Sequence, residues 1–357
     1  MPSTVQGNLP VRLTVEALNV YIQKLTEPIY RNARLLGALK AKGRIKVGVD
    51  SPDIRWKARV LRREPQVLTP DMANVTFNSG PRTVEAVLPW RGYTMGEHVN
   101  LMEKLVGRKN KAAVLPRILD NVIKWSMDDM QVFLQKALYY DGDSGTNHIH
   151  GLESWFGYGA NIGGTPVRTP NDTYAGLTTA LGGLAYGGSW TGAWPTGDGE
   201  PQYCAWSPLC VDYKSTLFGG NTWDANWSFA IRYATTYLSK LTGEIPDIAV
   251  MDPDLLRRAK DSLQDKYRLS VTPKSPIVDM GIQTMNFDGI ELMDDPFCPT
   301  GKAYVLNSNR LELLSLQDQL LAVNTKDDVL QSDYTAVMFI GNLRCESPAY
   351  HAVLFGA

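Results

Sequence analysis

The sequence predicts a mixed α+β fold, and three patterns support this prediction. Apolar residues recur at helical spacing in several segments, whereas other segments alternate apolar and charged residues as β-strands do. Glycine and proline residues separate these segments, and the 357 residues include 31 glycines and 21 prolines. A chain of this length can bury a large core, in one elaborate domain or in several smaller ones.

The first third of the chain predicts a helical arm followed by a ribbon of strands. Residues 14–42 have the spacing of an amphipathic helix interrupted near Pro28. The stretch IRWKARVL, residues 54–61, alternates cleanly, and the extended pieces NVTFN and RTVEAVLPW flank a turn, SGP. We therefore expect residues 50–92 to form a two-faced ribbon that has little apolar surface of its own and needs a partner.

A long helix and a turn-rich region are expected next. Apolar residues after Lys111 keep a helical period through Trp125, Met130 and Phe133, which predicts a helix of about 30 residues. Residues 151–220 are rich in glycine and tryptophan and have few periodic runs.

The last part of the chain alternates strands and helices. WDANWSFAIRYATTYLSKL and PDLLRRAKDSLQDKYRL read as helices, with Pro253 near the start of the second, and PDIAVMD between them reads as a buried strand. Residues 290–293 and 303–306 read as two strands of a hairpin, and DYTAVMFIGNL and PAYHAVLFGA supply two more strands.

Composition and charge narrow the function classes. The net charge of −1 excludes a uniformly basic nucleic-acid-binding protein, and the start of the chain has neither a signal-peptide pattern nor a membrane-spanning run, so we expect an intracellular protein. The charge is unevenly placed: residues 1–65 hold thirteen bases and five acids, whereas residues 285–333 hold three bases and nine acids. These segments are either two solvated faces of one monomer or surfaces that meet between subunits. The four cysteines lack zinc-ligand spacing and read as reduced, packed thiols.

Four motifs are candidate functional sites, each with a plainer explanation. Asp143 in DSGT resembles the aspartic-protease turn, although one copy would require a symmetric dimer, and a turn that ends a helix explains it better. GYGANIGG lacks the dinucleotide-loop spacing. His148 and His150 could begin a metal site, but a third ligand is missing nearby, and loop histidines are the better explanation. A DNA-facing patch could be formed by Lys104, Arg108, Lys109 and Lys111. A solvated turn is the plainer explanation of these four bases.

The order of the parts resembles a known family. The basic helical arm, the ribbon, the long helix, GLESW, TYAGLTTA, IAVMDPDLLRRAKD and FDGIELMDDPFCPTGKAYVLN together resemble the major capsid proteins of tailed bacteriophages, which have the Hong Kong 97-type fold. The resemblance spans nearly the whole chain and depends on the order and lengths of segments. It implies an arm at residues 1–49, an extended β-hairpin loop at 50–95, a peripheral domain with a long spine helix at 96–245 and 326–357, and an axial domain at 246–325.

The resemblance implies a structural protein rather than an enzyme. It implies self-assembly into hexamers and pentamers of an icosahedral shell around double-stranded DNA, with no cofactor, metal or membrane. Partners would be further copies of the chain, packaged DNA by non-specific contact, and scaffolding, portal and decoration proteins, in a virion assembled in the host cytoplasm. Expected inter-subunit contacts are Arg55, Lys57, Arg59, Arg62 and Arg63. Rival readings are an encapsulin-like compartment for protein cargo and a dimeric aspartic hydrolase using Asp143.

Overall fold

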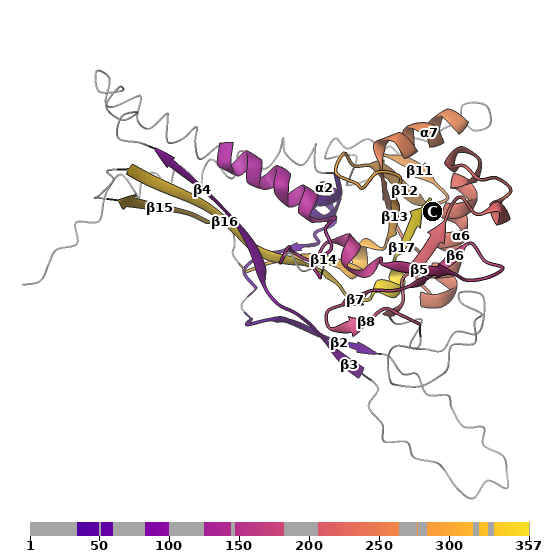
Figure 1. Ribbon diagram of the computed structural model, residues 1–357, viewed down its shortest axis with the longest axis horizontal. Coiled ribbons are helices and arrows are strands. Elements are labelled where there is room, and N and C mark those ends of the chain that lie inside the picture. The colour runs from indigo at the N-terminus through magenta and orange to yellow at the C-terminus, as the bar shows by residue number, and fades with distance from the viewer. Residues whose placement is uncertain are drawn as a thin grey trace, which may run out of the picture.

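The structure is a computed structural model, in which two β-sheets with covering helices make up most of the described chain (Figure 1). It describes residues 34–49, 51–59, 83–99, 125–143, 147–181, 206–263, 277, 284–316, 321–327 and 332–356. None of the described helices combines the length and the hydropathy needed to cross a membrane.

The five-stranded sheet contains the longest strand, β16 (Ser332–Cys345). Along one edge β16 pairs antiparallel with β15 (Leu321–Asp327) and then with β14 (Leu311–Ser315). Strand β4 (Arg91–Val99) also pairs antiparallel with β16. The short strand β1 (Ile45–Lys46) adds to β14 in parallel. Strands β4, β15 and β16 reach far out from the rest of the molecule (Figure 1).

The eight-stranded sheet lies between two hydrophobic cores. Its order is β11-β12-β10-β13-β17-β9-β6-β5. The bounds are β5 (Tyr158–Asn161), β6 (Val167–Pro170), β9 (Leu209–Asp212), β10 (Ile248–Met251), β11 (Met285–Phe287), β12 (Ile290–Asp294), β13 (Ala303–Leu306) and β17 (Ala352–Phe355). All four residues of β9, β10, β13 and β17 are buried, as expected for central strands covered on both faces.

Two helices cover one face of this sheet. Both α6 (Trp223–Thr242) and α7 (Pro253–Leu263) contribute apolar side chains to the core that also contains Ala249, Val305 and Leu354 of the sheet. Gly243 ends α6 in the left-handed conformation, and its N–H donates to the Ser239 carbonyl 2.9 Å away. Both helices and the strand β10 between them confirm the sequence prediction.

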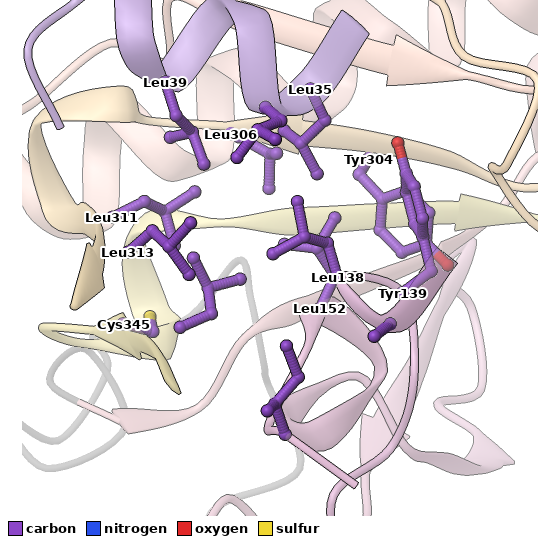
Figure 2. Close-up of a cluster of buried hydrophobic side chains, with 14 of the residues drawn as sticks. Leu35, Leu39, Leu138, Tyr139, Leu152, Tyr304, Leu306, Leu311, Leu313 and Cys345 are labelled. Atoms are coloured by element: carbon purple, nitrogen blue, oxygen red, sulfur yellow. The ribbon is translucent and has the colours of Figure 1, made fainter. Parts of the chain in front are cut away.

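The second core fills the space between the two sheets. It joins the opposite face of the eight-stranded sheet to β14, to the helix at 125–137 and to α2 (Arg34–Ala41). Figure 2 shows Leu35 and Leu39 of α2 directed toward Leu306 of β13 and Leu311 of β14. The 3-10 turn η2 (Leu152–Trp155) and the small hairpin of β7 (Thr173–Tyr174) and β8 (Leu177–Thr178) complete this side.

Three sequence predictions need correction. Strands β12 and β13 do not form a hairpin, because β10 lies between them, parallel to β12 and antiparallel to β13. In the described parts of the arm and the ribbon, the inward-facing apolar side chains of α2 and of residues 54–58 and 86–88 lie in or against the core of the subunit rather than being left for a partner. Trp125, expected on the apolar face of its helix, is 62% exposed. Other residues of that helix, including Met130 and Ala137, are buried as their spacing predicts.

Each sheet combines segments that lie far apart in the sequence. Strands β5, β6, β9 and β17 share a sheet with β10 to β13, although the sequence-based boundaries placed them in different domains. Among the described elements the chain passes from one sheet to the other three times: from β4 to β5, from β13 to β14 through η4 (Ser308–Arg310), and from β16 to β17 through η5 (Pro348–Tyr350).

Candidate assembly interface

The ribbon presents one apolar and one basic face. Strand β2 (Ile54–Arg59) pairs antiparallel with β3 (Thr83–Leu88) in register from Ile54–Leu88 to Arg59–Thr83. Because side chains alternate along a strand, Ile54 and Ala58 turn into the core together with Ala86 and Leu88. The sequence predicted this alternation correctly.

Three bases occupy the outer face of β2. Arg55, Lys57 and Arg59 are exposed, and their partners across the ladder are Val87, Glu85 and Thr83. Arg55 has acidic neighbours within the subunit, Asp53 at 3.0 Å and Glu85 at 3.9 Å. No ion pair joins Lys57 or Arg59 to another described residue.

The ribbon is anchored rigidly at its base. The Trp56 indole N–H donates to the Glu346 carbonyl 2.9 Å away, and the Trp90 indole N–H donates to the Ser51 carbonyl at 2.7 Å. The ring of Trp56 lies 6.1 Å from that of Tyr174, whose hydroxyl accepts a hydrogen bond from the Cys345 amide at 2.7 Å. The basic face is therefore held in a fixed orientation on the five-stranded sheet.

The other predicted basic residues lie outside the described part of the chain. These are Arg62 and Arg63 of the expected contact set and the whole possible DNA-facing patch: Lys104, Arg108, Lys109 and Lys111.

Part of the predicted charge complementarity is satisfied inside one subunit. Arg34 pairs with Asp294, and Lys46 pairs with Glu312 at 2.7 Å, so bases of the arm meet acids of residues 285–333 in the same chain. Arg34 and Lys46 are therefore paired within the chain, and the hypothesis that the basic segment meets acidic surfaces between subunits stays a prediction. Sequence reasoning found the charge asymmetry but missed the internal pairing, because composition does not show which surfaces the fold brings together.

Asp143 lies in a turn beyond the helix at 125–137. Its carboxylate is 3.9 Å from the Arg91 guanidinium and 3.8 Å from Nε2 of His150. Burial raises the pKa of Asp143, and the positive charge of Arg91 partly opposes this rise. Arg91 also donates to the His148 carbonyl at 2.7 Å, so the arginine and the carboxylate belong to a network that fixes this turn.

The two histidines of HIH lie in separate environments. The His148 ring packs 4.8 Å from the Tyr140 ring, whereas the His150 ring is buried 6.0 Å from Tyr174. Burial lowers the pKa of His150 to about 4, which keeps its ring neutral. Within the described ranges no three histidine, cysteine or carboxylate side chains converge as metal ligands would.

The glycine-rich motif at residues 157–164 is part of a β-hairpin. Strand β5 pairs antiparallel with β6, and the Ile162 N–H donates to the Val167 carbonyl at 2.9 Å. A dinucleotide loop leads from a strand into a helix, so this segment lacks the geometry for that function. Three of the cysteines, Cys210, Cys298 and Cys345, are free and buried, as predicted.

The arrangement of sheets and helices matches that of solved capsids. A chain in the cyanophage A-1(L) capsid asymmetric unit matches with a TM-score of 0.60 at 15% identity, over 90% of this chain and 92% of that one. The chain has the fold of a phage capsid protein. A chain in the capsid of a native GTA particle matches this capsid fold with a TM-score of 0.54 at 10% identity, over 90% of each chain.

A compartment protein gives a weaker match. The holo-SrpI encapsulin complex from Synechococcus elongatus matches with a TM-score of 0.46 at 9% identity, over 89% of this chain and 86% of that one. No protein-family model and no curated protein matches the sequence.

Proposed function

We propose that this chain is a major capsid protein that self-assembles into hexamers and pentamers of an icosahedral shell around double-stranded DNA. The observation that carries the proposal is the match to the cyanophage capsid chain, which covers about nine tenths of both chains. A fold shared over about nine tenths of the two chains supports the same geometric role, because the shape of a subunit determines how copies tile a shell. The role is structural and non-enzymatic.

The proposed division of the chain follows the two sheets. The arm (1–49) and the extended loop (50–95) are proposed with the bounds that the sequence suggested, and β4 continues from the loop into the five-stranded sheet. We assign the eight-stranded sheet with α6 and α7 to the axial part and the five-stranded sheet with the helix at 125–137 to the peripheral part.

The outer face of β2 is the proposed contact between subunits. Arg55, Lys57 and Arg59 are exposed on a rigidly anchored strand, and Arg62 and Arg63 follow in sequence. Bases on a fixed surface steer an acidic neighbour into register before docking. Lys104, Arg108, Lys109 and Lys111 are the proposed weak contact with packaged DNA. Scaffolding, portal and decoration proteins are the further proposed partners, and the proposed location is the virion after assembly in the host cytoplasm.

Electron microscopy of the expressed protein tests the proposal. We expect closed icosahedral particles, either from the chain alone or on co-expression with neighbouring phage genes. A monodisperse monomer under every condition would contradict it. The particle contents separate the two shell readings: nuclease-protected DNA supports a capsid, whereas a co-purifying enzyme inside the particle supports an encapsulin-like compartment.

A further inference from the structure

Segment 34–46 contacts both sheets, although it belongs to the interior of neither. On the side of the eight-stranded sheet, the Arg34 guanidinium pairs with Asp294 of β12, and the Leu35 amide donates to the Asp295 carboxylate at 3.0 Å. Lys42 pairs with Asp247, which directly precedes β10, at 2.5 Å. Three successive contacts therefore fix α2 to the β10–β12 half of this sheet.

The same segment then joins the five-stranded sheet. Strand β1 pairs with β14, and the Leu313 N–H donates to the Arg44 carbonyl at 2.9 Å. Lys46 pairs with Glu312, and the same carboxylate pairs with Arg344 of β16, each at 2.7 Å. Within thirteen consecutive residues, 34–46, the chain is thus bonded first to one sheet and then to the other.

Two of the three covalent links between the sheets, those through η4 and η5, lie close together. The Glu346 N–H, after β16, donates to the Arg310 carbonyl, before β14, at 2.9 Å. Arg310 also pairs with Glu244 and, at 2.9 Å, with Glu346. The third link, from β4 to β5, is long and includes the helix at 125–137. Two short crossings at one place beside a long third link are compatible with a hinge, because a few residues at element ends can absorb a rotation.

Segment 34–46 spans this hinge and fills the core beside it. Leu35 and Leu39 are each 1% exposed and pack in the core between β13 and β14 (Figure 2). A rotation of one sheet against the other would have to break the ion pairs at one end of the segment or draw these side chains out of the core. The segment therefore resists a change in the angle between the sheets.

We propose that segment 34–46, by bonding to both sheets, sets the angle between them and so the shape of the subunit. The proposal concerns the isolated chain and does not require the capsid function. If the proposed function also holds, which is a separate matter, a neighbour that displaces this segment alters the wedge angle of the subunit and with it the curvature of the shell.

Distance measurements between spin labels test the proposal directly. Labels are placed across the hinge on Thr94→Cys of β4 and Thr236→Cys of α6, both exposed positions, in a chain that carries Cys204→Ser. A second pair, on Thr94→Cys and Leu316→Cys, reports within the five-stranded side. The test variant is Arg34→Gln, Lys42→Gln and Lys46→Gln, which removes three ion pairs and keeps the apolar side chains. The matched control is Arg258→Gln, which breaks the 2.7 Å pair with Asp224 between α6 and α7 and does not cross the hinge.

We expect the test variant to lose the single narrow distance across the hinge and to keep the distance within the five-stranded side. The control should change neither. Hydrogen exchange of the Leu313 amide should be about tenfold faster in the test variant, a change of about 1.4 kcal/mol in opening free energy. An unchanged distance across the hinge overturns the proposal. A change in both distances overturns it too, because it would show general loosening of the chain. If Arg34→Asp broadens the distance across the hinge and added Asp294→Arg restores the narrow distance, the result would support a specific ion pair between positions 34 and 294.

Discussion

Charge reversal on the outer face of β2 should weaken assembly and leave the free subunit unchanged. The perturbation is Lys57→Glu with Arg59→Glu, chosen because both side chains are exposed and neither pairs with another described residue. Arg55 is left in place because it pairs with Asp53. Exposed substitutions of this kind change the free energy of unfolding by about 0.5 kcal/mol or less.

The effect on assembly follows from the strength of exposed ion pairs. Each pair is worth about 0.2–1 kcal/mol, and reversal replaces an attraction by a repulsion. Two reversed side chains should therefore cost about 1–2 kcal/mol per contact, which corresponds to about a 5- to 30-fold weaker association. The same contact recurs around a shell, so the concentration needed for assembly should rise by at least this factor.

Light scattering against protein concentration, at low and high salt, measures the effect. The wild-type chain should assemble less readily as salt screens the contact, and the variant should have lost most of this salt dependence. The control is Lys136→Glu with Lys214→Glu, which changes the net charge equally at exposed positions away from β2. If the β2 variant assembles at the wild-type concentration and with the wild-type salt dependence, these bases are only a solvated face.

Three further predictions concern the stability of the subunit. Asn342→Ala should lower the free energy of unfolding by about 2–5 kcal/mol in urea titrations, because the buried amide bonds the His150 N–H and the Pro89 carbonyl and its loss leaves both unsatisfied. A decrease of only about 0.5 kcal/mol in the free energy of unfolding, as at an exposed site, would mean that water replaces the amide. Leu39→Ala should cost about 2–5 kcal/mol, whereas Leu217→Ala, at a 59% exposed position, should cost little; equal melting temperatures would contradict the burial of α2. Burial lowers the pKa of His351 to about 3 and of His150 to about 4 in the folded chain, below the value of about 6.5 in the unfolded chain. These two histidines therefore leave the free energy of unfolding undiminished above pH ~6.5 and reduce it as the pH falls from ~6.5 toward their folded pKa values. Burial raises the pKa of Asp172 to about 6, so this group increases the free energy of unfolding as the pH falls from ~6 to ~4. The loss of stability at low pH should therefore be steeper in Asp172→Asn and shallower in His351→Gln than in the wild-type chain. Unfolding curves from pH 7 to 4 measure this loss, and the reverse order of the two variants would refute these roles.

The sequence predicted those elements whose signal is local. The period of α6, the apolar run of β10, the proline at the start of α7 and the alternation of β2 each depend on residues a few positions apart, and the structure confirms all four. The exposed bases of the candidate interface followed from the same alternation.

The sequence did not show which distant segments pair. Strands β12 and β13 are close in sequence with turn residues between them, so a hairpin was the natural prediction, and only the fold shows that β10 separates them. Trp125 was placed on the buried face because its spacing fits, yet the helix has no neighbour there among the described residues. The internal pairing of Arg34 with Asp294 was missed for the same reason: it depends on residues 260 positions apart.

The position of β17 governs how the eight-stranded sheet can form during folding. It lies between β13 and β9, antiparallel to one and parallel to the other, and all its residues are buried. Until β17 is placed, β9 with β6 and β5 and β13 with β10, β12 and β11 are two half-sheets with open apolar edges. Open edges of this kind recruit strands from other chains, and pairings between distant segments form slowly. The step most exposed to aggregation is therefore the insertion of this one strand, so substitutions in residues 352–355 should reduce the yield of soluble chain before any effect on shell geometry can be seen.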